Sequence, residues 1–320
     1  MKDFYPSRYD GQAQMLPRME PCAWQDWSPA APMTRSQYDH WCRDGFLVLN
    51  NLFSETETAL FRRELARLEH NRDLMARPQA VTESGTGDLR SLFSPHQYSN
   101  LYKALSRDRR LLEIAHFLLD DDVYIHQARV NFKPGLTGKG FYWHSDFETW
   151  HTEDGMPRMR ALSVSITLTD NTAANGPLML IPGSHKTFVS CPGRTPAHHH
   201  EQSLQAQKLG TPPADHLTRL SEDGGITPIM GKAGSVVLFD CNTLHGSSEN
   251  LSPRPRSNIF FVFNSVRNRL SNPFAAPSPR PDYLAARGRP RPLEALRPDY
   301  QALACDTRDT EALEAETRSF

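Results

Sequence analysis

The sequence predicts an α+β protein, mainly β, in which helices come first and a β-barrel or sandwich core follows. Two patterns lead to this prediction. Within residues 34–120, apolar residues recur at helical spacing behind helix-capping signatures. After Asp122 they follow a period of two, in short runs separated by Gly, Pro and Asn turns. The length of 320 residues suits one large domain, because all-β barrels often exceed 200 residues as a single unit.

Capping signatures locate the first two helices. Thr34 and Gln37 have the spacing of a capping box, and the helix they open is expected to end near Gly45. Ser54 and Glu57 repeat the signature ahead of a second stretch of apolar residues at helical spacing.

The remaining elements follow from periodicity alone. A short strand is expected at residues 46–49 and a third helix at about 109–120. Six further strands are expected at residues 123–133, 140–146, 160–169, 177–182, 234–240 and 257–264.

A single catalytic domain is expected at residues 34–271, with an arm before it, an extension after it and one long loop inside it. Residues 1–33 are rich in Pro and Met, which indicates an arm that lies on the body or is partly disordered. Residues 190–216 form a long polar connection, expected to be a mobile lid loop. Residues 272–320 begin as a Pro- and Arg-rich extension, expected to pack on the same domain, and finish as a weakly helical tail.

Composition excludes several classes of partner. The net charge is −1 and no basic stripe is present, so neither nucleic acid nor an anionic membrane is an expected partner. The first residues lack the apolar core of a signal peptide, and the longest apolar runs are only of strand length. The five cysteines form no C-x-x-C pair, which favours a reduced cytoplasm: Cys22, Cys42, Cys191, Cys241 and Cys305.

A candidate metal site lies at the end of the strand predicted at residues 140–146. His144 and Asp146 are two residues apart in FYWHSDFETW, so on a strand both side chains would point to one face. His245 is the best-placed third ligand, because it follows the strand at 234–240, which could lie beside the first. Two histidines and one carboxylate leave adjacent positions of an octahedral iron free for a substrate acid and O₂.

Other histidines are weaker candidates. His151 and Glu153 repeat the spacing, but a charged turn makes a solvated role the preferred interpretation. Residues 198–200 are three consecutive histidines, and neighbours in a flexible loop rarely converge on one buried ion. His126 is interpreted as a packed histidine on a strand.

Arg256 gives the second part of the site. It follows His245 by eleven residues, a spacing that can return a guanidinium to the same interior as the metal. A planar fork suits the remote carboxylate of a dicarboxylic acid. Ser247 can add a hydroxyl, whereas Arg254 is expected at the surface.

At these motifs the chain resembles the phytanoyl-CoA-hydroxylase-like superfamily of iron(II)/2-oxoglutarate-dependent dioxygenases, and within it the ectoine hydroxylases. The stretch FYWHSDFETWHTEDGMPRMRALSVSITLTDNTAANGPLMLIPGSHK carries most of the resemblance, together with FDCNTLHGSSENLSPRPRSNIFFVFN and DGFLVLNNLFS. It covers roughly residues 1–310 and is weakest in 190–216 and the tail.

The resemblance implies a double-stranded β-helix (jelly-roll) core with flanking helices, a homodimer, and hydroxylation of ectoine to 5-hydroxyectoine with Fe(II), 2-oxoglutarate and O₂. Iron ligation carries over to His144, Asp146 and His245. Contacts with 2-oxoglutarate carry over to Asn131, Phe141, Ser247 and Arg256. Contacts with ectoine carry over to Gln127, Trp150, Ser165, Phe239 and Phe260.

Some of these residues have a plainer interpretation. Aromatic faces attract a delocalised cation such as the amidinium ring that the resemblance implies for ectoine. Core packing nevertheless remains the preferred interpretation of Phe239 and Phe260, whereas Trp150 stands in a charged segment. The polar face of the strand at 123–133, which includes Gln127, is either a solvent face or a barrel interior. Rival functions are a sister oxygenase of another small amino-acid-like substrate, a cupin-like metal-binding protein without catalysis, and a zinc hydrolase.

Overall fold

Two facing antiparallel sheets form the centre of the protein. The computed structural model describes residues 2–83, 85–204, 209–288 and 290–304. Within them the larger sheet has seven strands, in the order β2 (Phe46–Leu49), β11 (Val236–Asp240), β7 (Ala161–Thr167), β13 (Arg256–Ser265), β5 (Val123–Lys133), β4 (Leu89–Phe93) and β3 (Ala80–Thr82).

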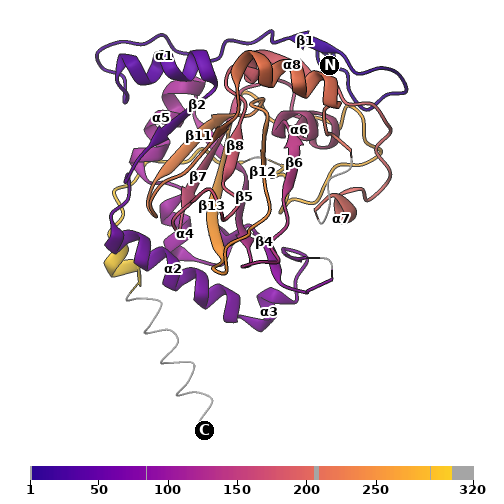
Figure 1. The fold of residues 1–320 in the computed structure, drawn as a ribbon. Coiled ribbons are helices and arrows are strands. Elements are labelled where there is room, and N and C mark those ends of the chain that lie inside the picture. The colour runs from indigo at the N-terminus through magenta and orange to yellow at the C-terminus, as the bar shows by residue number, and fades with distance from the viewer. Residues whose placement is uncertain (1, 84, 205–208, 289, 305–320) are drawn as a thin grey trace.

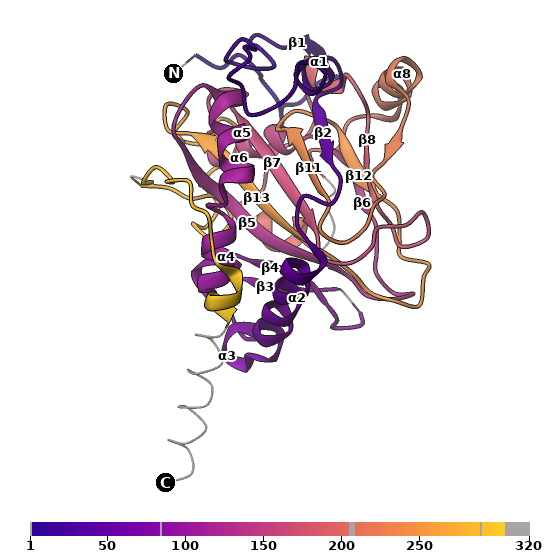
Figure 2. The same cartoon turned by 90° about the vertical axis from the view of Figure 1, so that its left-hand side faces the viewer.

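The smaller sheet has four strands and lies against one face of the larger one (Figures 1 and 2). Among the described residues no strand pairing joins these two sheets, so they face each other without closing into a barrel. This confirms the mainly β, α+β prediction and its jelly-roll core. The order in the smaller sheet is β10 (Thr227–Pro228), β8 (Leu178–Leu180), β12 (His245–Ser247) and β6 (Phe141–His144), and a separate pair joins β1 (Met15–Pro17) to β9 (Thr187–Val189).

Helices cover the other face of the seven-stranded sheet, which Figure 2 shows from the side. Residues of α1, α2, α4 and α5 join one large apolar cluster with that face. The described residues form these helices in all, of which α6 and α7 contribute to the cavity on the opposite side of the sheet: α1 (Arg35–Asp44), α2 (Glu55–His70), α3 (Arg72–Met75), α4 (Asn100–Leu105), α5 (Arg109–Leu119), α6 (Asp146–Asp154), α7 (His200–Ser203) and α8 (Ala214–Gly224). Two 3-10 turns lie at Pro95–Gln97 and Ser184–Lys186.

The two predicted capping boxes are confirmed. Thr34 accepts a hydrogen bond from the backbone N–H of Gln37 at 3.2 Å, and Ser54 accepts one from Glu57 at 3.2 Å. Helix α1 ends at Gly45, whose φ of 81° is left-handed. A Cβ at this position would lie 2.4 Å from the His185 ring, so the turn requires glycine both for its backbone and for space.

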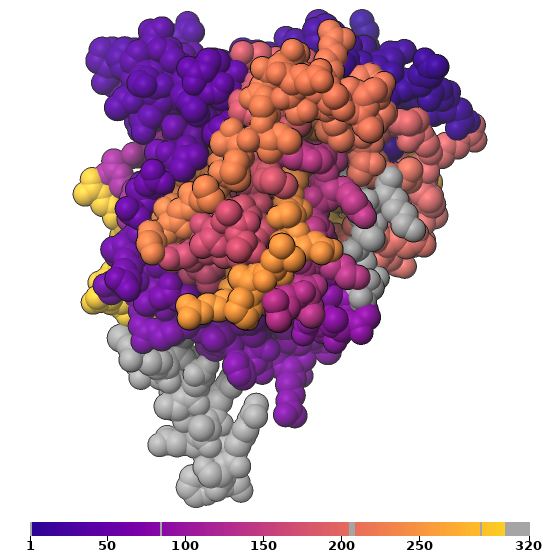
Figure 3. Space-filling model, in the orientation of Figure 1, coloured from indigo at the N-terminus to yellow at the C-terminus, as the bar shows by residue number. Residues whose placement is uncertain are grey.

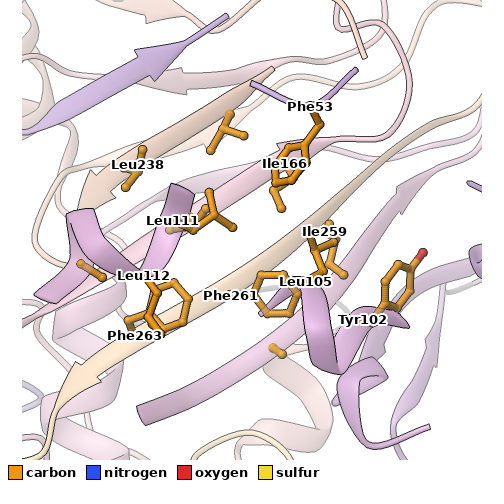
Figure 4. Packing of buried hydrophobic residues seen from close by; sticks show 14 of the residues in the cluster. Phe53, Tyr102, Leu105, Leu111, Leu112, Ile166, Leu238, Ile259, Phe261 and Phe263 are labelled. Carbon is orange, nitrogen blue, oxygen red and sulfur yellow. The ribbon is translucent and has the colours of Figure 1, made fainter. Parts of the chain in front are cut away.

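Period-two alternation divides the strands into an apolar face and a polar face. On β13, Ile259, Phe261 and Phe263 pack against the helices and are fully buried. Figure 4 shows these three side chains near Leu111 and Leu112 of α5. Fully burying one such side chain stabilises the fold by about 1.5–3 kcal/mol. The opposite face of the same sheet, toward the smaller sheet, carries the polar residues that form the site.

Two sequence predictions differ from the structure here. The strand expected at 140–146 ends at His144, and Asp146 begins α6. The connection 190–216 is only partly irregular, because it contains α7 and the start of α8, while residues 205–208 lie outside the described residues.

The remaining outer segments vary in how much of them is described. Residues 2–33 lie across the top of the molecule in the space-filling view (Figure 3). The tail from residue 305, with Cys305, lies outside the described part. Within the described residues, no helix is long and apolar enough to span a membrane.

Candidate metal centre and substrate cavity

Two strands and one helix bring the predicted metal ligands together. His144 ends β6 and His245 begins β12, and the two residues are direct cross-strand partners. Asp146 reaches them from the first position of α6. The ligand atoms of all three side chains lie within 4.8 Å of one another. The same-face argument for a strand was therefore wrong for Asp146, although the cluster that it predicted does form.

Hydrogen bonds hold the two imidazoles in one orientation. His144 Nδ1 lies 2.7 Å from the carbonyl of Tyr142, and His245 Nδ1 lies 3.0 Å from the carbonyl of Thr243. A ring that donates from Nδ1 has a bare Nε2 for metal binding. Each Nε2 lies 3.8 Å from an oxygen of Asp146. This geometry fits a divalent cation held between the three side chains.

The surroundings of the three side chains favour the charge states that metal binding requires. Burial lowers the pKa of His245 to about 4, with the neighbouring His144 adding to the effect. Burial also lowers the pKa of His144. For Asp146, burial alone would raise the pKa, but His245 and Arg129 outweigh it and the pKa is lowered. Two neutral imidazoles and one carboxylate are the charge states that bind iron(II).

Beside the triad lies a cavity of about 520 Å³ between the two sheets. Its volume suits a small molecule, because ligand pockets are commonly 300–1,000 Å³. Seven of the nine residues predicted to contact substrate or co-substrate line it: Gln127, Asn131, Phe141, Trp150, Ser247, Arg256 and Phe260.

The other two lie behind the cavity wall. The ring of Phe239 packs 4.9 Å from that of His245, measured between centroids. The hydroxyl of Ser165 accepts a 3.4 Å hydrogen bond from the side-chain amide of Asn258. The structure does not bring either residue to the cavity surface.

Arg256 is a buried cation in the wall of this cavity. It is the first residue of β13 and is 4% exposed. In the described part of the chain no carboxylate lies within 4.0 Å of its guanidinium, and its buried Nε has no hydrogen-bond partner. Burial lowers its pKa to about 10. A buried cation without a partner is costly unless an anion binds there.

The residues around Arg256 also suit an anionic ligand. Ser247 and Asn131 line the same cavity, and Asn131 accepts a 3.0 Å hydrogen bond from Ser91. Phe141 lies beneath the guanidinium of Arg90, whose carbon is 3.9 Å from the ring centroid. This end of the cavity therefore combines positive charge with hydroxyl and amide groups.

Comparison with known proteins agrees with this site. The phytanoyl-CoA dioxygenase (PhyH) family matches residues 41–258, more than half of the chain. The chain belongs to the phytanoyl-CoA dioxygenase family. Within it, the ectoine dioxygenase of Sphingopyxis alaskensis is 47% identical over 297 residues, covering 93% of this chain and 97% of that protein. The ectoine dioxygenase of Bordetella parapertussis is 48% identical over 299 residues, covering 92% and 97%.

Solved structures give the same result. The crystal structure of EctD from S. alaskensis with 2-oxoglutarate and 5-hydroxyectoine has a TM-score of 0.86 and 44% identity, covering 93% of this chain and all of that one. The carbocyclase SnoK of nogalamycin biosynthesis has a TM-score of 0.60 at 16% identity and supports the fold alone.

The part of the cavity near Trp150 is lined by aromatic rings and by the guanidinium of Arg129. Trp150 is 2% exposed, lines the cavity, and packs edge-on against His126 at 5.0 Å. The Arg129 guanidinium carbon lies 4.8 Å from the ring centroid of Phe260. Gln127 and Arg129 line the cavity, so the polar face of β5 is an interior face and not a solvent face.

The interpretation of the charged turn was wrong. His151 and Glu153 lie on α6 and are 0% and 2% exposed. Among the three consecutive histidines, His199 is buried and its Nδ1 lies 3.0 Å from Glu153. His198 has an exposed side chain. His126 is packed as expected, at 1% exposure.

Sequence reasoning missed several charged residues of the cavity wall. Arg8, Arg90 and Arg280 line it, and each pairs with a buried carboxylate. Arg280 forms two hydrogen bonds with Asp154, 126 residues away in sequence. No local pattern marks Arg8 and Arg280, because tertiary structure brings them to carboxylates that are 140 and 126 residues away in sequence.

Proposed function

We propose that the protein is a non-haem iron(II)- and 2-oxoglutarate-dependent dioxygenase that hydroxylates ectoine to 5-hydroxyectoine, with O₂ consumed and succinate and CO₂ released. One observation carries the proposal: a two-histidine, one-aspartate cluster opens into the same cavity as Arg256, which is buried and has no carboxylate partner among the described residues. The ectoine dioxygenases that the chain resembles support the choice of substrate. Such an enzyme would act in compatible-solute biosynthesis and osmotic protection.

Three side chains are proposed to hold the metal. His144 and His245 would bind iron(II) through Nε2, because their Nδ1 atoms are engaged with backbone carbonyls. Asp146 would add a carboxylate, kept in place by a 3.2 Å hydrogen bond from Ser163. Bound iron(II) supplies the activation of O₂. The protein contributes ligand geometry and a buried setting that excludes water.

The co-substrate is proposed to lie between the metal and Arg256. The fork of Arg256 would bind the remote carboxylate, with Ser247 and Asn131 adding hydrogen bonds and Phe141 an apolar wall. A dicarboxylate would supply the counter-ion that the buried guanidinium lacks. This argues against a purely structural metal-binding protein, which would have no need of a second charged site.

Ectoine is proposed to occupy the remaining part of the cavity. Trp150 and Phe260 would offer aromatic faces to its amidinium ring, and Gln127 would donate or accept a hydrogen bond. Phe239 and Ser165, which lie behind the wall, would act by supporting His245 and the strand that carries Phe260. A sister oxygenase of another small amino-acid-like substrate would have the same triad, so the substrate end decides between the two.

Aerobic incubation with Fe(II), 2-oxoglutarate and ectoine tests the proposal. Mass spectrometry should show one added oxygen on ectoine and an equal amount of succinate. Omission of ectoine should reduce succinate, and omission of 2-oxoglutarate should abolish both products. Coupled hydroxylation of another amino-acid-like solute, with ectoine left unchanged, would favour the sister-oxygenase alternative.

Other parts of the proposal concern segments around the domain. Described residues of 190–216, including His199, Leu204 and Leu209, line the cavity, which supports a covering role. Its mobility stays a prediction, as do the domain limits 34–271 and the packing of 272–320. A homodimer is also proposed, testable by light scattering. Free thiols at Cys22, Cys42, Cys191 and Cys241 support a cytoplasmic location.

A further inference from the structure

The side chain of Arg8, in the N-terminal arm, is buried at the wall of the catalytic cavity. Arg8 is 5% exposed and lines the cavity that contains the metal cluster. It precedes Glu148, its main partner, by 140 residues. The arm is therefore part of the cavity wall, and the role of the Arg8 guanidinium in that wall needs a physical account.

Arg8 binds two carboxylates of α6. Its Nε and Nη2 donate to the two oxygens of Glu148 at 2.6 and 2.8 Å, a bidentate pair. Its Nη1 lies 3.3 Å from Oε1 of Glu153. Glu148 and Glu153 are 1% and 2% exposed, so both pairs are shielded from water. Arg8 thus holds α6 at two points, one turn or more apart.

The same residue also holds the segment that follows β9. Its backbone N–H donates to the carbonyl of Cys191 at 2.8 Å, and its Nη1 donates to the hydroxyl of Thr195 at 3.4 Å. Farther along that segment, His199 Nδ1 lies 3.0 Å from the same Glu153 oxygen that faces Arg8. The N-terminal arm, α6 and residues 191–199 therefore meet around the guanidinium of Arg8 and the carboxylate of Glu153.

The backbone of Arg8 is in the left-handed region, with a φ of 60°. This conformation is uncommon for a residue with a long side chain and persists where surrounding contacts impose it. Here those contacts are the carbonyl of Cys191 and the carboxylates of Glu148 and Glu153. A strained backbone and a buried ionic network at the same residue, on the cavity wall, indicate a functional constraint.

We propose that Arg8 is a positioning residue for the organic substrate: it fixes α6, and with it Trp150, against residues 191–199 so that the N-terminal arm completes the substrate end of the cavity. Because Asp146 and Trp150 lie on the same helix, a shift of α6 changes the placement of substrate relative to metal. The inference rests on the proposed function for its activity readout. Arg8 itself need not touch substrate, because its donors toward α6 are already engaged.

The variants Arg8→Met and Arg8→Lys test this, with Arg194→Met as the matched control. Arg194 pairs with Asp10 and so also joins the segment to the arm, but the two side chains are 81% and 67% exposed. In Arg8→Met we expect the KM for ectoine to rise at least tenfold and succinate to exceed hydroxyectoine severalfold. The KM for 2-oxoglutarate should stay within twofold. Arg8→Lys should recover part of the coupling, and Arg194→Met should match the wild type.

Hydrogen–deuterium exchange of the iron-free proteins gives a readout that does not depend on turnover. Peptides covering residues 146–154 and 191–204 should exchange faster in Arg8→Met than in wild type and Arg194→Met, while peptides of β13 should not change. A lower melting temperature with unchanged exchange, coupling and ectoine KM would overturn the positioning role. If the wild type makes no hydroxyectoine, the proposed function fails, and the exchange comparison still decides whether Arg8 holds α6 and the segment.

Discussion

Replacing Arg256 by methionine should weaken co-substrate binding and at the same time stabilise the ligand-free protein. The guanidinium is 4% exposed and, among the described residues, has no carboxylate within ion-pair distance. Its folded pKa of about 10 is below its ordinary value of 12.5. At about 1.4 kcal/mol per tenfold, a difference of 2.5 in pKa corresponds to about 3 kcal/mol.

The sign of this contribution is unfavourable for folding at neutral pH. The charged form is disfavoured in the folded state, so the whole cost is present below pH 10 and shrinks only at higher pH. Arg256→Met removes it, and the free energy of unfolding without ligand should rise by up to about 3 kcal/mol, less any loss from imperfect packing. Binding should change in the other direction, because truncating one partner of a buried charge pair costs about 2–5 kcal/mol.

Two measurements on one preparation check both effects. Calorimetric titration in the presence of a redox-inert divalent metal should show 2-oxoglutarate affinity lowered by about 30-fold or more, at 1.4 kcal/mol per tenfold. Thermal unfolding without ligands should give a higher melting temperature than wild type. Arg254→Met, at an exposed neighbour, should alter neither quantity. An Arg256→Met variant with a lower melting temperature than wild type and an unchanged affinity for 2-oxoglutarate would refute the reasoning.

Three further outcomes are expected. Asp146→Ala should lose bound iron and turnover together while keeping its far-UV circular dichroism, and a folded variant that retains iron would remove this carboxylate from the site. Trp150→Ala should lose ectoine affinity by about 1–2 kcal/mol or more with 2-oxoglutarate binding intact, and an unchanged affinity in a less stable variant would make the ring a packing residue only. Burial holds the pKa of His96 and His185 at about 4, below the usual 6.5, so the unfolded chain takes up protons first as pH falls. The melting temperature should therefore drop between about pH 6.5 and 4, and less steeply when these two histidines are replaced by glutamine.

Local signals in the sequence predicted local structure well. The capping box of Thr34 and Gln37 defines the start of α1 because both groups are three residues apart and need no tertiary partner. The strand at 123–133 coincides with β5, since its alternation reflects the two faces of the sheet. Such features depend on neighbours along the chain.

Helix α6 shows where this reasoning fails. It is buried on nearly all sides, so its residues have no amphipathic period that would distinguish it from a strand end and a turn. Glu148 and Glu153 have the charge of a solvated turn, but the distant Arg8 forms ion pairs with both of them inside the protein. A buried ion pair formed by residues 140 apart leaves no pattern in either local sequence.

The site was predicted to different extents at its two ends. His144, His245 and Arg256 could be found because each lies at the end of a strand, β6, β12 and β13 respectively. Asp146 was found from its spacing to His144, although it begins α6 and is not on a strand. Ser165 and Phe239, carried over by resemblance alone, lie behind the wall. Whether a side chain forms the surface of a cavity or its backing depends on the packing of both sheets, which sequence spacing does not determine.

The division of β5 and β13 into an apolar face and a polar face has a consequence for changing what the protein accepts. On β5, Ala128, Val130 and Phe132 belong to the core, while Gln127 and Asn131 line the cavity. Between residues 127 and 132, tolerance to mutation should therefore alternate residue by residue, with even positions limited by packing and odd positions limited by ligand chemistry. The register shift before Gln127 reverses this order, since Ile125 packs against the core. Mutant libraries restricted to positions 127, 129 and 131 should alter the substrate range while the protein stays folded. Inserting one residue into this part of the strand would turn the core residues toward the cavity and the cavity residues toward the core, so that both folding and binding would be lost.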